Sequence, residues 1–273
     1  ENTYLISGGT DLIIKLKENP QIDVNLIDLS GVEELKYIKV EGNTVKIGSR
    51  ATFTQISENE DIIKYGLCLA QAASGVGSKQ IRNRGTIGGN IGNSSPAGDT
   101  IPALCALGAD VTVMDGQGGF EIIPAADIIT GIGKNRIGCG RVITEISFPI
   151  RDDNYISAFH KIGSRSTVTI ARLNMAVLIK YHRSNNSIME ANAALGALGT
   201  KVICSNSINN LLCGRSVDET LREELAEALT EEVDKAILGR ASQKYKRHAI
   251  RGLAYDIWEK LFNEDTLGRK GEI

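Results

Sequence analysis

Apolar residues in the first 150 positions form short runs typical of strands, alternating with apolar positions at helical spacing. The runs predict strands over residues 4–6, 26–29, 37–40, 45–47, 111–114 and 142–148. Helical spacing covers residues 12–16, most of 52–76 and 101–107. Glycine-rich polar stretches lie between these elements, most densely over residues 75–98 and again over 131–140. We interpret both stretches as loops.

The pattern changes after Pro149. Residues 158–162, 173–181 and 188–195 predict antiparallel strands, and residues 217–229 and 243–262 predict helices. The last helix has a single apolar stripe, which we interpret as core. The sequence therefore predicts an α+β protein with an N-terminal α/β domain over residues 1–150. A smaller α+β domain follows over residues 151–273.

The composition argues against several classes of function but does not identify one. The net charge of -2 gives no broad cationic field, so nucleic acid is a poor candidate partner. No apolar run is long enough to cross a bilayer. The five cysteines show no C-x-x-C spacing, which is typical of reduced thiols in a cytoplasmic protein. The three histidines are far apart in the chain, so we predict no metal site.

The 29 glycines are clustered, and the first cluster follows an apolar run. Residues 7–11, Ser-Gly-Gly-Thr-Asp, stand between a predicted strand and a predicted helix. Backbone N–H groups in such a turn can converge on a phosphate, and the helix N-terminus adds partial positive charge. An ordinary tight turn without a ligand would have the same pattern, so this motif alone leaves both interpretations open.

The second cluster offers more chemistry. Residues 82–91, Arg-Asn-Arg-Gly-Thr-Ile-Gly-Gly-Asn-Ile, supply paired glycines, a hydroxyl, an amide and two guanidinium groups. Asp99 follows closely and could accept hydrogen bonds from ribose hydroxyls. Two phosphate-type loops suit a diphosphate better than a single phosphate. For Arg82 and Arg84, a surface position and a contact to a cofactor or partner are equally open.

Neither cluster is a standard nucleotide fingerprint. Gly75-Val76-Gly77 lacks the third glycine of the Rossmann motif, because Gln80 stands there. Gly131-Ile132-Gly133 fails in the same way at Arg136, and no P-loop is present. A dinucleotide bound without these motifs points away from ordinary NAD dehydrogenases.

These motifs resemble the FAD-binding subunits of molybdenum hydroxylases, the family of xanthine, carbon monoxide and nicotinate dehydrogenases. The resemblance covers nearly the whole chain and rests on residues 8–11, 80–83, 86–90, 95–96 and Asp99. It implies a vanillyl-alcohol-oxidase-like FAD domain of two α/β subdomains, over about residues 1–50 and 51–150, followed by the antiparallel sheet and helices of a carbon monoxide dehydrogenase flavoprotein. Relatives usually have a further strand and helix before the first glycine turn.

The resemblance also implies roles for individual residues. The pyrophosphate would be wrapped from one side by Leu5, Ile6, Ser7, Gly8, Gly9, Thr10, Asp11 and Leu12, and from the other by Thr86, Gly88, Gly89 and Asn90. Asn93 would stand against the cofactor, and Asp99 would hold the adenosine ribose. Val76 and Ile143 would lie near the isoalloxazine ring. Lys161 would approach its pyrimidine edge, where a fixed ammonium would stabilise the reduced flavin; without the resemblance, a solvated lysine is the simpler interpretation.

The implied function is electron transfer through FAD, with no catalytic residue of the chain's own. A small 2Fe-2S subunit would supply electrons from a large molybdopterin-binding subunit, and NAD or another carrier would accept them. Residues 164–168 lack the acidic character of the loop that controls NAD access in mammalian xanthine enzymes, which leaves the acceptor open. Two alternatives also remain: a stand-alone FAD-dependent oxidoreductase of the same fold, and a scaffold subunit without cofactor.

Overall fold

A computed structural model describes residues 3–18, 20, 23–165 and 168–262. The helices are α1 (Leu12–Glu18), α2 (Phe53–Glu58), α3 (Glu60–Tyr65), α4 (Leu67–Ser74), α5 (Lys79–Arg82), α6 (Ile87–Asn93), α7 (Thr100–Leu107), α8 (Ala125–Ile128), α9 (Asn206–Leu212), α10 (Glu219–Ile237) and α11 (Gln243–Phe262). Among the described residues, no helix has the length and apolarity needed to cross a membrane.

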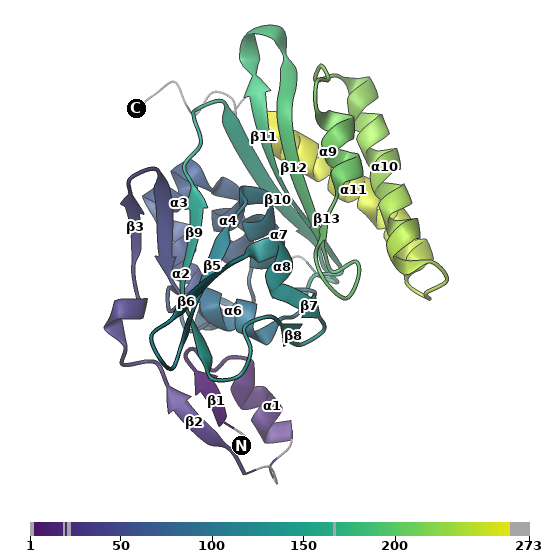
Figure 1. The fold of residues 1–273 in the computed structure, drawn as a ribbon. Helices are drawn as coiled ribbons and strands as arrows, with labels where there is room; N and C mark the ends of the chain where they lie inside the picture. The colour runs from purple at the N-terminus through teal and green to yellow at the C-terminus, as the bar shows by residue number, and fades with distance from the viewer. Residues whose placement is uncertain (1–2, 19, 21–22, 166–167, 263–273) are drawn as a thin grey trace.

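The strands fall into four sheets (Figure 1). They are β1 (Thr3–Ile6), β2 (Asn25–Asp28), β3 (Ile38–Glu41), β4 (Thr44–Gly48), β5 (Asp110–Asp115), β6 (Phe120–Pro124), β7 (Ile129–Gly131), β8 (Lys134–Asn135), β9 (Arg141–Pro149), β10 (Tyr155–Ile162), β11 (Leu173–His182), β12 (Ser187–Gly196) and β13 (Ile203–Cys204). Two of the sheets are large and two are two-stranded pairs, so the core is built on the two large sheets.

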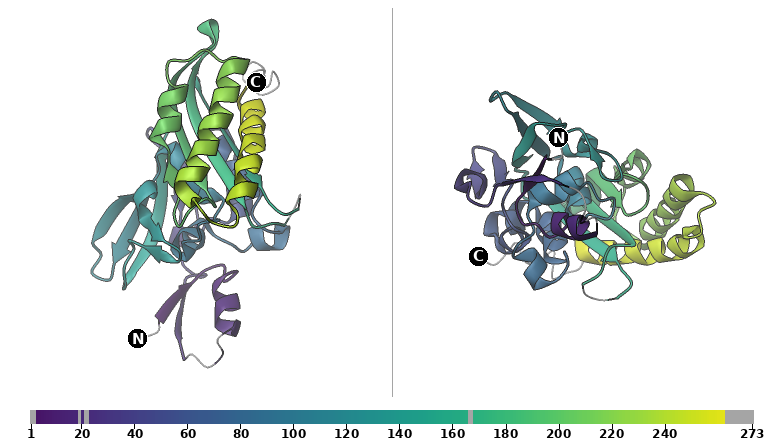
Figure 2. Two further views of the ribbon diagram at one scale, coloured as in Figure 1. Left: turned by 90° about the vertical axis from the view of Figure 1, so that its right-hand side faces the viewer. Right: turned by 90° about the horizontal axis from the view of Figure 1, so that it is seen from below.

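The N-terminal lobe consists of β1, α1 and β2. The two strands pair in parallel, with Thr3 opposite Asn25 and Ile6 opposite Asp28. The lobe projects from one end of the molecule (Figure 2). None of its strand or helix residues is buried, so it adds little to the hydrophobic core.

The first large sheet has the order β3-β4-β9-β5-β6, and all its neighbouring strands are antiparallel. Burial alternates along β4 and β5, because successive side chains of a strand point to opposite faces. The buried face carries Val45, Ile47, Val111 and Ile146, which pack with Leu69, Ile87 and Leu104 of the neighbouring helices.

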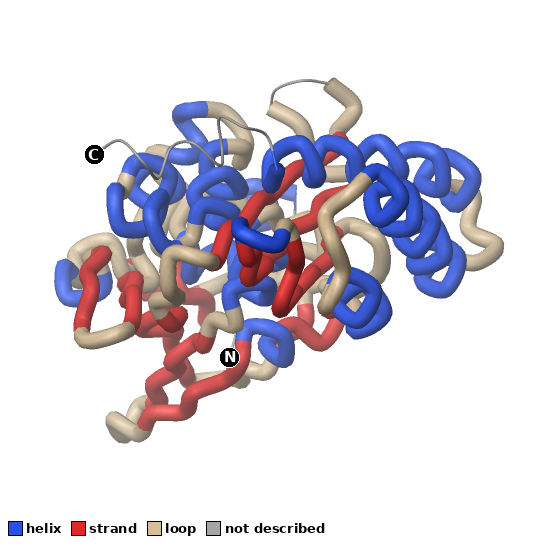
Figure 3. Tube along the Cα trace, turned by 90° about the horizontal axis from the view of Figure 1, so that it is seen from above, coloured by secondary structure: helices blue, strands red, loops and turns tan. Residues whose placement is uncertain are grey.

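The second large sheet, β10-β11-β12-β13, lies between helices on both sides (Figure 3). Helices α4 and α7 contact strands β10, β11 and β12, and α9 and α11 contact the same three strands. Strand β11 is almost continuously buried, as expected for a strand covered on both faces. The apolar stripe predicted for residues 243–262 is confirmed as core, with Ile250, Leu253 and Ile257 fully buried.

The structure corrects the predicted loops. Residues 87–93 form helix α6, inside the stretch that we interpreted as a loop. The glycine-rich stretch 131–140 contains β8 and the end of β7, which pair as a hairpin. Strand β6 and helix α9 have no counterpart in the predicted pattern, and α10 extends to Ile237 instead of residue 229. Helix α6 is stabilised by bonds to Ser49 and Ala51, which are distant in sequence, whereas β6 and the β7–β8 hairpin form by pairing between adjacent segments of the chain.

Candidate functional site

The first glycine turn lies where the sequence predicts it, between β1 and α1. Gly9 has a φ of 73°, a left-handed conformation that glycine adopts without steric cost. Within the described residues, the N–H groups of Gly8, Gly9 and Thr10 donate to no backbone or side-chain acceptor. Three neighbouring N–H donors at the start of a helix are suited to an anion.

The turn packs directly on the second glycine motif. A Cβ added to Gly8 would lie 2.0 Å from the carbonyl oxygen of Arg84 and 3.0 Å from the Cα of Gly85. At the C-terminal end of α6, just beyond that motif, Nζ of Lys15 in α1 donates to Oδ1 of Asn93 over 2.5 Å. The fold thus brings together the two motifs that the sequence suggests for one diphosphate. We call the turn Ser7–Asp11 and helix α6 together the cradle.

Helix α6 differs from the turn because its first N–H groups already have acceptors. The hydroxyl of Thr86 caps the helix and accepts from the N–H of Gly89 over 3.2 Å. The N–H of Gly88 donates to the carbonyl of Ser49 over 2.9 Å, and that of Asn90 donates to the carbonyl of Thr86. These amides therefore serve the fold, and α6 contributes a surface instead of donors.

On that surface the helix backbone is uncovered by side chains, because α6 has glycines where other helices have larger residues. Gly88 needs to be glycine for packing, since its Cβ would lie 2.7 Å from Cβ of Ser49. Gly89 is exposed, and its Cβ would meet only the hydroxyl of Thr86, at 2.9 Å. The side chain of Asn90 turns the other way and accepts from the hydroxyl of Thr100 over 2.7 Å.

Asp99 and Lys161 form an ion pair between the start of α7 and β10. Nζ of Lys161 lies 2.5 Å from Oδ2 of Asp99, and it also donates to the carbonyls of Gly75 and Thr169. Asn174 donates to the second oxygen of Asp99 over 2.9 Å. Burial raises the pKa of Asp99 above its ordinary value, and the nearby Lys161 ammonium opposes that rise.

These contacts occupy the groups to which the family resemblance gives cofactor roles. Both carboxylate oxygens of Asp99 have partners, and the three N–H bonds of Lys161 match its three acceptors. The ribose contact of Asp99 and the flavin contact of Lys161 stay predictions. The arrangement itself ties the α4 end, α7 and β10 together.

Comparison with known proteins decides the family. Residues 1–151 match the family described as the FAD binding domain in molybdopterin dehydrogenase, and residues 158–261 match the CO dehydrogenase flavoprotein C-terminal domain. This chain belongs to the family of FAD-binding subunits of molybdenum hydroxylases. The resemblance seen in the sequence is confirmed.

Curated relatives agree with this assignment, and a solved structure has the same fold. The nicotinate dehydrogenase FAD-subunit of Eubacterium barkeri is 32% identical over 94% of this chain and 86% of its own. The glyceraldehyde dehydrogenase medium chain of Sulfolobus acidocaldarius is 27% identical over 96% of this chain and 91% of its own. A carbon monoxide dehydrogenase structure from Hydrogenophaga pseudoflava superimposes with a TM-score of 0.86 at 23% identity, covering 96% of this chain and 91% of that one. The predicted fold class is confirmed.

The two residues that the family resemblance places near the isoalloxazine ring, Val76 and Ile143, lie outside the cradle. Val76 is half-buried and packs against the hydrophobic core of the first large sheet, and Ile143 lies in β9 and is 7% exposed. Their contact with a flavin ring stays a prediction. Arg82 is accounted for locally, since its guanidinium donates to the carbonyls of Val76 and Gly77.

Sequence reasoning missed Ser49 and Asn135, which support α6 from other elements. Ser49 follows β4 and accepts from Gly88, while Asn135 in β8 donates to the carbonyl of Gly92. Neither residue stands in a motif, so no local signal marks them. Among the described residues, no cluster of three His, Cys, Asp or Glu could hold a metal ion.

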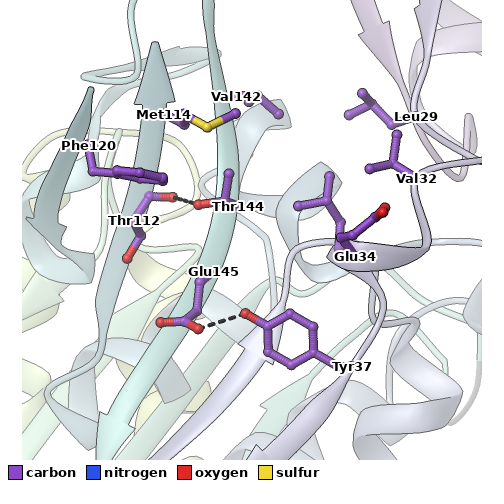
Figure 4. Close-up of a pocket in the computed structure, with 11 residues that line it drawn as sticks. Leu29, Val32, Glu34, Tyr37, Thr112, Met114, Phe120, Val142, Thr144 and Glu145 are labelled. Carbon is purple, nitrogen blue, oxygen red and sulfur yellow. Dashed lines mark hydrogen bonds between the residues drawn. The ribbon is translucent and has the colours of Figure 1, made fainter. Parts of the chain in front are cut away.

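A separate hollow of about 640 Å³ lies against the first large sheet (Figure 4). Its lining is mostly apolar, and the hydroxyl of Tyr37 donates to Glu145 over 2.6 Å at one side. Burial and the adjacent Glu145 raise the pKa of Tyr37 well above its ordinary value. None of the predicted cofactor residues lines this hollow, so the cradle remains the candidate site.

Proposed function

We propose that this chain holds FAD with its diphosphate in the cradle and serves as the electron-transfer subunit of a molybdenum hydroxylase. The observation that carries the proposal is the contact of Gly8 with Arg84 and Gly85, beside a glycine-rich helix. At this contact the turn has three N–H donors that find no acceptor in the part of the chain that the structure describes. An anion fits such a place because the donors need no rearrangement and no Cβ blocks the approach.

The cradle has two walls, the turn Ser7–Asp11 and helix α6, and each would contribute differently to binding. The N–H groups of Gly8, Gly9 and Thr10 would donate to the phosphate oxygens, and the hydroxyl of Thr10 would add a donor. Ser7 and Asp11 would flank these contacts, and Leu5, Ile6 and Leu12 would keep the turn in place from β1 and α1. Across from them, Gly88 and Gly89 would let the diphosphate approach the α6 backbone.

Other residues would position the rest of the cofactor. We propose that Val76 and Ile143 pack near the ring, and that Asn93 lies beside the cofactor. Asp99 would hold the ribose and Lys161 would approach the ring's pyrimidine edge. Lys161 would have to release one of its three acceptors to do so, and its hydrogen bond to the backbone carbonyl of Thr169 is the longest of the three, at 3.2 Å.

When bound, FAD supplies the ability to accept single electrons and to release a pair, for example as hydride. We propose that a 2Fe-2S subunit donates the electrons, that they originate at a molybdopterin-binding subunit, and that NAD or another carrier accepts them. The names of the relatives describe FAD-subunits and medium chains of dehydrogenases, which supports a role for this chain as one subunit of a larger redox complex. The residues of this chain would bind the cofactor and tune its potential.

Purification of the full chain tests the proposal. We expect stoichiometric FAD, visible because oxidised flavin absorbs blue light, and molybdenum and iron that co-elute with the chain in the native complex. A folded chain that stays colourless after incubation with excess FAD would refute cofactor binding. Turnover of an organic substrate by the isolated chain would instead favour a stand-alone oxidoreductase.

A further inference from the structure

Helix α6 is intrinsically weak. It has seven residues, three of which are glycines, and glycine is the poorest helix former after proline. Short helices in proteins depend on tertiary contacts for their stability. At its N-terminal end α6 has the Thr86 cap and the N–H bonds to Ser49 and Ala51. Its orientation also depends on what holds the other end.

The C-terminal end of α6 is held by the β7–β8 hairpin, which lies beside the helix in Figure 1. Nδ2 of Asn135 donates to the carbonyl of Gly92 over 3.2 Å and to the hydroxyl of Ser94 over 2.9 Å. The N–H of Gly133 donates to the carbonyl of Ser94 over 3.1 Å. Ser94 itself is fully buried and left-handed, with a φ of 52°.

Asn135 is fixed in turn by its own hairpin. Its Oδ1 accepts from the N–H of Ile137 over 3.1 Å, so its amide plane is set and both functional groups are used. The N–H of Arg136 donates to the carbonyl of Ile128, which anchors the hairpin to α8. Hydrogen bonds therefore connect α8 to the hairpin, and the Asn135 side chain connects the hairpin to Gly92.

We propose that Asn135 is a positioning residue for the FAD site: it satisfies a last-turn carbonyl of α6 and thereby fixes the glycine surface of the cradle. This inference rests on the proposed function. A last-turn carbonyl has no partner inside its own helix and needs one from elsewhere. Without Asn135, the end of α6 would fray and the surface facing the diphosphate would no longer be preorganised.

The chain offers a matched control in the next helix. Nδ2 of Asn192 in β12 donates to the last-turn carbonyls of α7, Cys105 over 3.4 Å and Ala106 over 2.8 Å. Asn135→Ala and Asn192→Ala thus remove the same kind of bond from two helices, of which only one belongs to the cradle. Asn135→Asp keeps the size and the acceptor but removes the donors, and it serves if the alanine variant does not fold.

The experiment measures the FAD dissociation constant and the amide exchange of α6 in full-length variants. Loss of two hydrogen bonds predicts a dissociation constant about tenfold higher for Asn135→Ala and Asn135→Asp, and no change for Asn192→Ala. Without FAD, the N–H of Ser94, which donates to Asn90 and Ile91, should exchange faster in the two Asn135 variants only.

Each contrary outcome has its own meaning. Wild-type affinity in both Asn135 variants, or equal weakening in Asn192→Ala, would overturn the positioning role. Unchanged exchange at Ser94 would overturn it as well, even if no variant bound FAD. Absence of FAD binding in the wild-type chain would refute the proposed function, and the exchange comparison would still decide whether Asn135 braces α6.

Discussion

The turn Ser7–Asp11 and helix α6 lie side by side, yet they differ in burial and in the state of their N–H groups. In the turn, Gly8, Gly9 and Thr10 are half-buried and their N–H groups have no acceptor among the described residues. In α6, Ile87 and Ile91 are fully buried, and the N–H groups of Gly88 and Gly89 have acceptors.

The difference teaches that two glycine motifs need not act alike. The turn has glycines because its backbone takes a left-handed conformation and touches Arg84, which leaves its donors outward. In helix α6, Gly88 has no room for a side chain because of Ser49, while Gly89 lies on the exposed surface and leaves space there. One motif supplies charge-stabilising donors and the other supplies space.

The largest effect on FAD affinity is expected where the turn Ser7–Asp11 touches the segment that precedes α6. Gly8→Ala would place a Cβ 2.0 Å from a backbone carbonyl, so the walls must separate. The N-terminal lobe can tilt away to relieve this overpacking, so its cost of about 1–3 kcal/mol falls on FAD binding, and we expect FAD affinity to fall about a hundredfold. The free energy of unfolding should change little, because no strand or helix residue of the N-terminal lobe is buried.

Equilibrium dialysis and urea unfolding measure these two quantities. Gly31→Ala, in the same part of the chain with no heavy atom within 4 Å of the added Cβ, is the control and should bind FAD normally. Normal FAD affinity in Gly8→Ala would mean that the contact of the two walls is irrelevant to binding.

The space above α6 is tested by Gly89→Val. A branched side chain would fill the volume beside the diphosphate, and we expect FAD affinity to fall about thirtyfold. Folding should persist, because valine is a better helix former than glycine. Gly252→Val, at an exposed glycine of α11 with open surroundings, is the matched control. Full flavin content in folded Gly89→Val would argue strongly against the cradle.

The cap of α6 is tested by Thr86→Ala. Loss of an N-cap costs about 1 kcal/mol, so we expect that loss in unfolding free energy and an affinity about fivefold lower. Thr86→Ser keeps the hydroxyl and should restore both values. If Thr86→Ala lost stability without any loss of FAD affinity, the order of α6 would not matter to the cofactor.

The smallest effect is expected for Lys15→Ala, which removes the bridge from α1 to Asn93. Exposed polar contacts are worth about 0.5 kcal/mol, so FAD affinity should fall about twofold, and less at high salt. Lys36→Ala, at another exposed lysine outside the cradle, should have no effect. A tenfold effect at low salt would show that Lys15 binds the diphosphate directly.

The sequence predicts well the elements whose pattern is strong. Residues 173–181 and 243–262 were expected as a strand and a helix, and β11 and α11 lie there, because long apolar patterns outweigh local noise. It fails at α6, because three glycines in seven residues oppose a helix and the bonds to Ser49 and Ala51 come from distant positions.

The candidate site also has parts that could be predicted from the sequence and parts that could not. The nearness of the two glycine motifs could be predicted from the family resemblance, and the contact of Gly8 with Arg84 bears it out. The pairing of Asp99 with Lys161 could not, because nothing in the chain marks which buried groups will meet. The role of Asn135 could not be predicted from the sequence either, because its bond to Gly92 depends on where the β7–β8 hairpin lies.

Amide hydrogen exchange with and without FAD tests the division of the cradle most directly. The account predicts that FAD slows exchange at Gly8, Gly9 and Thr10, while Gly88, Gly89 and Asn90 are already slow in the free chain and change little. Slowing confined to Gly88–Asn90, with Gly8–Thr10 unaffected, would contradict it.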